Sequence, residues 1–153
     1  TRVALVVEDN RSVSEQVVAA LINRGFMCRS VGSVEGALHN LRIRRPNVIV
    51  LDYRLADGTA AEVLRAMRDS EWTEIPVVLA TAEIQTARRT CGSFEPVKAV
   101  LQKPVSVDTL VAAAEENATP ARDAAFRTVT LAERRLLLDP LFDTASATVQ
   151  EAV

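Results

Sequence analysis

The sequence lacks any apolar run long enough to cross a membrane, and it contains little cysteine. Its longest apolar runs, such as residues 48–51 and 77–80, extend over a handful of residues, whereas a membrane-spanning helix needs about 20. No basic segment followed by an apolar one opens the chain, so we expect no secretion signal. The two cysteines, Cys28 and Cys91, lack metal-ligand spacing and indicate reduced, structural thiols. These absences favour a cytoplasmic protein that makes no membrane contact.

Net charge is also small. The 153 residues carry a formal net charge of −2, which gives no general electrostatic reason to bind nucleic acid. Apolar residues make up 48% of the chain, enough to build a core. The length suits one ordinary domain with a modest extension. We therefore predict one globular domain without a nucleic-acid partner.

Short apolar runs alternate with helical patterns along most of the chain. Five runs predict strands: residues 3–7, 26–31, 48–51, 75–80 and 97–101. Apolar residues at helical spacing follow most of these runs, but residues 83–95, where a fourth helix belongs, are irregular and polar. Strands that alternate with helices predict an α/β fold, with a parallel sheet covered on both faces.

Polar residues stand where the apolar strands stop. They are Glu8 and Asp9 after the first strand, Asp52 after the third, Thr81 after the fourth and Lys103 after the fifth. Open α/β sheets bind ligands beyond the carboxyl ends of their strands. These residues are therefore the candidate site.

Four motifs occur in order: VVEDN at 6–10, VIVLDYRLADG at 48–58, VVLATA at 77–82 and VLQKP at 100–104. With these motifs, residues 1–117 resemble the receiver domains of two-component response regulators. The resemblance implies a doubly wound (βα)5 receiver fold, with a five-stranded parallel sheet of strand order 2-1-3-4-5.

In that strand order, strands one and three are neighbours, so Glu8 and Asp9 would lie beside Asp52. Three clustered carboxylates need a cation, and a hard, oxygen-preferring ion such as Mg²⁺ fits. A carboxylate can also attack phosphorus to give an aspartyl phosphate. The resemblance assigns the phosphoacceptor to Asp52, the principal metal ligand to Asp9 and its acidic neighbour to Glu8. It adds the backbone carbonyl of Arg54 as a further metal ligand.

Two further residues would handle the phosphoryl group. Lys103 offers a fixed counter-charge and Thr81 a hydroxyl donor. The resemblance implies the same roles, a charge-balancing lysine and a phosphate-sensing hydroxyl, and a cis bond between Lys103 and Pro104. Position 100 departs from the family pattern, because Val100 stands where Tyr or Phe often rotates inward on phosphorylation.

Arg54 and Glu83 occupy positions that flank the acceptor in the family. An ion pair between them would restrict water and slow hydrolysis of the phosphoryl group. The alternative is that they are two unrelated surface charges.

Residues 118–153 leave the alternating pattern. Thr130 and Glu133 have the spacing of a capping box, and several leucines follow. Residues 129–141 resemble the opening of a helix-turn-helix domain, but the residues after them do not continue it. So short a segment cannot form a second core. We predict a helical C-terminal extension that docks on the domain or forms a homodimer.

We therefore hypothesise a phosphorelay switch. A histidine kinase or phosphotransfer protein supplies the phosphoryl group to Asp52, and the domain catalyses only its own phosphotransfer and dephosphorylation.

A second hypothesis, motivated by Val100 and residues 83–95, is a receiver-fold interaction module with weak or absent switching. A third, a flavodoxin-like cofactor binder, is disfavoured because Glu8 and Asp9 stand where its phosphate loop needs small residues. The pathway and the downstream partner stay open.

Overall fold

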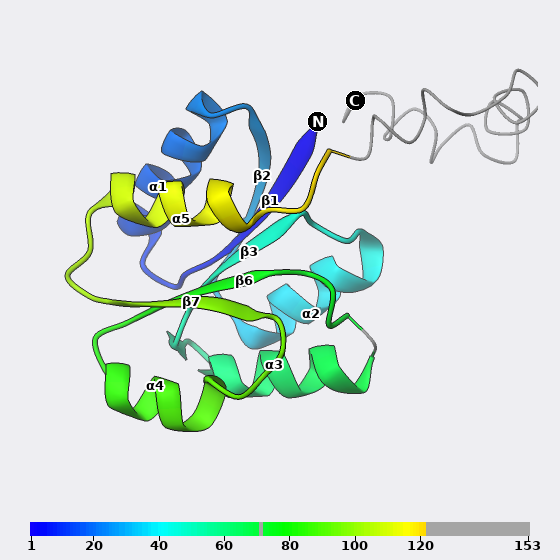
Figure 1. Ribbon diagram of the computed structural model, residues 1–153, viewed down its shortest axis with the longest axis vertical. Coiled ribbons are helices and arrows are strands. Elements are labelled where there is room, and N and C mark those ends of the chain that lie inside the picture. The colour runs from blue at the N-terminus through cyan, green and yellow to red at the C-terminus, as the bar shows by residue number, and fades with distance from the viewer. Residues whose placement is uncertain (71, 122–153) are drawn as a thin grey trace, which may run out of the picture. The chain divides into compact units, whose positions relative to one another are not determined.

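The described part of the chain is built around one parallel sheet. The computed structural model describes residues 1–70 and 72–121. Its main sheet contains five strands: β1 (Arg2–Val7), β2 (Phe26–Val31), β3 (Val48–Asp52), β6 (Val77–Thr81) and β7 (Val97–Gln102). Their spatial order is β2-β1-β3-β6-β7 (Figure 1), which is 2-1-3-4-5 when the main strands are numbered along the chain. The expected parallel α/β fold and strand order are confirmed.

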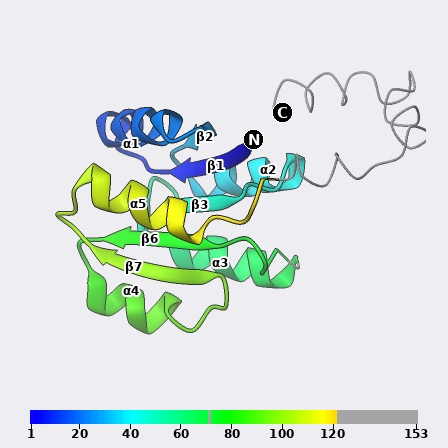
Figure 2. The same ribbon diagram turned by 45° about the horizontal axis from the view of Figure 1, so that its top comes forward.

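Five helices cover the two faces of this sheet. Helices α1 (Arg11–Asn23) and α5 (Val107–Asn117) pack on one face, and α2 (Val34–Ile43), α3 (Ala60–Asp69) and α4 (Ile84–Cys91) on the other (Figures 1 and 2). Each face has its own apolar core, because side chains of the central strands alternate between them. The sheet is thereby buried on both sides, which explains its nearly continuous apolar strands.

Helix α4 corrects one expectation from the sequence. The pattern of residues 83–95 was described as irregular and polar, although the (βα)5 fold places a fourth helix there, and Ile84–Cys91 form a regular helix of eight residues. Its buried residues are Ala87 and Cys91, which lie four positions apart on one face. Ile84, Ala87 and Cys91 recur at i, i+3 and i+7, so helical spacing is present in the sequence, although the segment is otherwise polar.

A small hairpin follows the third main strand. Strands β4 (Arg54–Leu55) and β5 (Gly58–Thr59) pair antiparallel across the turn predicted at Asp57 and Gly58. The Asp57 carboxylate accepts hydrogen bonds from the backbone N–H groups of Val34, at 2.6 Å, and Glu35, at 3.1 Å. These bonds tie the hairpin to the N-terminus of α2 and hold the pKa of Asp57 below its usual value.

The pKa of Asp57 predicts an acid-sensitive contribution to stability. A depressed folded-state pKa contributes stability above the unfolded value of about 3.9, and this contribution is lost as the pH falls through the folded value. We therefore expect Asp57→Ala to be less stable than the parent at neutral pH, with a gap that narrows below pH ~4. Urea unfolding at both pH values, with the exposed Asp69→Ala as control, measures the gap. A gap that did not depend on pH would contradict this account.

The compact unit that carries the sheet runs from Arg2 to Thr119. Buried Asn47 fastens its end, because Asn47 Oδ1 accepts from Val3 N at 2.7 Å and Asn47 Nδ2 donates to the Thr119 carbonyl at 3.3 Å. The helical extension predicted for 118–153 falls almost wholly outside the described residues.

Both cysteines are free thiols, and burial raises the pKa of Cys28 to about 11. None of the helices in residues 1–70 and 72–121 has the length and apolar character to span a membrane.

Candidate functional site

The candidate residues come together at the carboxyl ends of the strands. Strands β1 and β3 are adjacent and in register, with Val7 opposite Leu51. Asp52 ends β3, so it lies beside the residues that follow Val7. Strand β6 ends on Thr81, and its neighbour β7 ends one residue before Lys103. The topology alone therefore brings four separate segments to one edge.

Three carboxylates form the centre of the site. Glu8, Asp9 and Asp52 each offer an oxygen, and these atoms lie within 4.8 Å of one another. Glu8 is 8% exposed, the side chain of Asp52 is 12% exposed, and Asp9 faces solvent. The backbone N–H of Asn10, the N-cap of α1, donates to Glu8 Oε2 at 3.2 Å. An all-oxygen, anionic donor set of this kind fits a hard divalent cation.

Lys103 balances part of this negative charge. Its Nζ donates to Glu8 Oε1 and to Asp52 Oδ1, at 3.1 Å in each case. Burial by itself lowers the pKa of Lys103, but the hydrogen bonds and charges of the two carboxylates outweigh it and raise the pKa above its ordinary value. The ammonium is therefore charged at neutral pH. The Lys103–Pro104 bond is cis, as expected from the resemblance.

Thr81 is the last residue of β6 and is 2% exposed. Its Oγ1 accepts a hydrogen bond from Glu83 N at 2.8 Å, which leaves the hydroxyl proton free to be donated. Glu83 forms a two-point ion pair with Arg54, in which Arg54 Nη2 donates to Glu83 Oε1 at 2.8 Å and Nε donates to Oε2. The bonds to Arg54 hold the pKa of Glu83 below its usual value.

Two residues, Val100 and Tyr53, connect the site to the apolar core. Val100 lies on β7 opposite Leu79 and packs, half-buried, against the core beneath α2, α3 and α4. Tyr53 directly follows Asp52 and is 5% exposed within that core, with its hydroxyl 3.3 Å from Thr90 Oγ1. The sequence reasoning passed over Tyr53. The sequence did contain a signal for Tyr53, because it is the one tyrosine of the chain and directly follows the proposed acceptor.

Comparisons with known proteins agree with this arrangement. The family model described as the response regulator receiver domain matches residues 4–115. The probable transcriptional regulatory protein TcrX of Mycobacterium tuberculosis is 34% identical over 107 residues, which cover 70% of this chain and 45% of that protein. The phosphate regulon transcriptional regulatory protein PhoB of Escherichia coli is 31% identical over 109 residues, covering 71% and 48%. The chain thus spans about half the length of these relatives.

Solved structures show the same fold. The non-phosphorylated HemR receiver domain of Leptospira biflexa superimposes with a TM-score of 0.70 at 20% identity, covering 80% of this chain and 98% of that one. The response regulator TrrA of Thermotoga maritima, in complex with Mg(2+)-BeF, gives a TM-score of 0.66 at 20% identity, covering 76% and 98%. Together with the matched family model, the fold and the ordered motifs identify this chain as a member of the response-regulator receiver domain family.

Proposed function

We propose that Asp52 is the residue of this receiver domain that accepts the phosphoryl group. The observation that carries the proposal is the cluster of Glu8, Asp9 and Asp52, with Lys103 hydrogen-bonded to one Asp52 carboxylate oxygen. An Asp52 carboxylate oxygen attacks the phosphorus of a phosphohistidine. The oxygen–phosphorus bond forms as the phosphorus–nitrogen bond breaks, and the leaving imidazole nitrogen takes a proton from water.

The chain's own residues prepare this transfer. Glu8, Asp9, Asp52 and the backbone carbonyl of Arg54 would hold Mg²⁺, which supplies positive charge to the phosphoryl oxygens when bound. Lys103 is charged and already within hydrogen-bond distance of Asp52, so it can follow the developing charge without a large rearrangement. The Thr81 hydroxyl, whose oxygen already accepts from Glu83 N, donates a hydrogen bond to a phosphoryl oxygen.

Phosphorylation by a small-molecule donor tests this function. We expect phosphoramidate with Mg²⁺ to add the mass of one acid-labile phosphoryl group, and EDTA to prevent the addition, because the clustered carboxylates need a cation before they can approach an anion. Intact-protein mass spectrometry with and without EDTA measures both. Labelling that is equally fast in EDTA would contradict the metal-dependent mechanism.

The partner that this function requires is a histidine kinase or a phosphotransfer protein, in a cytoplasmic phosphorelay. The domain, placed at residues 1–117, catalyses only its own phosphotransfer and dephosphorylation. Its relatives include proteins named as transcriptional regulators, but the chain covers only about half of their length. We propose protein partners and no nucleic-acid partner for this chain.

The Arg54–Glu83 pair is proposed to protect the phosphoryl group. It bridges the segments that follow β3 and β6, on either side of the acceptor. We expect Arg54→Ala and Glu83→Gln each to speed dephosphorylation a few-fold, because either change opens the approach of water. Loss of the phosphoryl mass with time measures the rate, and Arg68→Ala, which breaks a surface pair on α3, is the control. An unchanged rate in both variants would leave the pair without this role.

A second candidate is the interaction module with reduced switching, which Val100 favours because no aromatic side chain stands at that position. Beryllofluoride with Mg²⁺, a mimic of the acyl phosphate, separates the two candidates. A switch changes its solution mass or its amide exchange when the mimic binds, whereas the module changes neither. The solution mass also tests whether the chain forms the homodimer proposed for residues 118–153.

A further inference from the structure

The two residues that follow Asp52 contact opposite ends of α4. Arg54 pairs with Glu83, the N-cap residue of that helix, and Tyr53 reaches Thr90 in its last turn. We propose that Tyr53 is a positioning residue that couples the acidic site to α4. The inference rests on the proposed function, since a bound phosphoryl group and cation are what Tyr53 would report.

Both peptide groups of Tyr53 are fixed by hydrogen bonds, and the residues on either side of it in the sequence belong to the proposed site. Its neighbours are the Asp52 carboxylate and the Arg54 carbonyl, the two proposed ligands on this segment. Its own N–H donates to the Ala80 carbonyl at 3.2 Å, and its carbonyl accepts from Ala60 N at 2.8 Å. Ala80 precedes the Thr81 hydroxyl. A cation or phosphoryl group that binds Asp52, Arg54 or Thr81 therefore displaces the peptide groups that hold Tyr53 in position.

The side chain of Tyr53 carries that position to α4. The ring is buried in the same core cluster as Ala87 and Cys91, the two buried residues of the helix. Its hydroxyl ends at Thr90 Oγ1, which in turn donates to the Thr86 carbonyl at 2.9 Å. Close-packed interiors transmit small displacements because they hold few voids. A shift of the rigid ring must therefore be taken up by α4.

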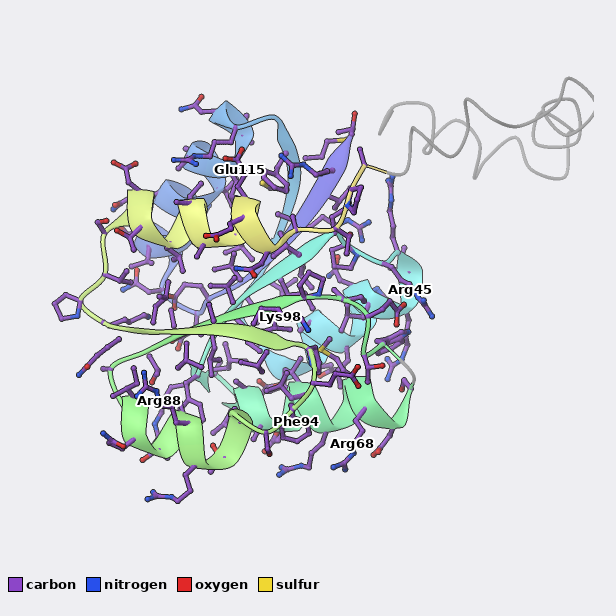
Figure 3. The ribbon with its side chains drawn as sticks, viewed as in Figure 1. Arg45, Arg68, Arg88, Phe94, Lys98 and Glu115 are labelled. Carbon is purple, nitrogen blue, oxygen red and sulfur yellow. The ribbon has the colours of Figure 1, made fainter. Side chains whose placement is uncertain are left out.

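Helix α4 is suited to respond. It has eight residues, two of them buried, and its N-cap Glu83 makes no side-chain capping bond. Helices with few buried contacts lie at the low end of local stability and adjust at small cost. Arg88 (Figure 3) and Arg89 are both exposed on this helix, so a change in α4 alters a cationic surface open to a partner.

Fluorine NMR tests the coupling at Tyr53 itself. Tyr53 is the only tyrosine in the chain, so 3-fluorotyrosine labelling gives one protein resonance, while bound beryllofluoride gives separate fluorine signals. We expect Mg²⁺ and beryllofluoride to shift the fluorotyrosine resonance. A resonance that stays in place while bound beryllofluoride is visible overturns the inference and leaves the proposed function intact. Absence of bound beryllofluoride overturns both.

Amide exchange separates coupling from mere proximity. In the parent, beryllofluoride should change the exchange of residues 84–91. In Tyr53→Leu this change should be lost while the bound fluorine signals persist. Thr90→Val, which keeps the ring, should weaken the change and serves if Tyr53→Leu folds poorly. The matched control is Phe94→Leu, because Phe94 packs on the same core but lies against Arg68 of α3 (Figure 3). A full α4 response in Tyr53→Leu or Thr90→Val, or its loss in Phe94→Leu, contradicts the coupling.

Discussion

Asp52→Asn is expected to take up no phosphoryl group under conditions that label the parent fully. The amide that replaces the carboxylate has nearly the same shape, but its oxygen is a poor nucleophile and cannot form an aspartyl phosphate. The variant should fold, because it removes one of three clustered negative charges and leaves a carbonyl oxygen for Lys103 to contact. Intact mass after incubation with phosphoramidate and Mg²⁺ should show the unmodified protein alone.

Asp57→Asn is the matched control for this result. Asp57 lies in the hairpin that follows the acceptor, but its carboxylate caps α2 and is outside the acidic cluster. This variant should be labelled like the parent. Equal labelling of Asp52→Asn and the parent would show that another residue accepts the phosphoryl group, and peptide mapping of the labelled protein would then identify it.

The acidic centre followed from short motifs because its residues stand directly at the ends of apolar strands. Strands that end on Asp52 and Thr81 place them at one sheet edge whatever the loops do, once the order is known. That order came from the family resemblance, since apolar patterning does not distinguish neighbouring strands in a sheet buried on both faces.

The parts that escaped the sequence depend on tertiary contacts. Helix α4 is an exception, because Ile84, Ala87 and Cys91 already recur at helical spacing within a segment that is otherwise polar. Asp57 was recognised as a turn residue, but its bonds to Val34 and Glu35 join segments more than twenty positions apart. Tyr53 escaped for a related reason, because its reach to α4 is a matter of packing. The sequence therefore predicted which side chains gather at the site better than it predicted how the site connects to the rest of the fold.

Lys103→Met is expected to slow phosphorylation by about 10² to 10³, the usual cost of removing one preorganised group that stabilises charge in the transition state. Its Nζ lies 3.1 Å from Asp52 Oδ1, next to the atom proposed to attack phosphorus. Methionine fills similar space without charge, so the acceptor and the metal ligands remain in place. Mg²⁺ affinity should not fall, and should rise, because the ammonium no longer competes for Glu8 and Asp52. Calorimetric Mg²⁺ titration and the phosphorylation rate at saturating Mg²⁺ measure the two effects.

These opposite effects distinguish charge balance from a structural role. If Lys103 only held the site together, Lys103→Met would loosen the carboxylates and lower both the Mg²⁺ affinity and the rate. Lys98→Met provides the control, because Lys98 is exposed on β7 (Figure 3), the strand that ends one residue before Lys103. It should match the parent in both measurements. A Lys103→Met protein that binds Mg²⁺ well but accepts phosphoryl groups slowly would place the lysine in the transfer step, because loss of its charge would then slow the transfer without weakening the metal site.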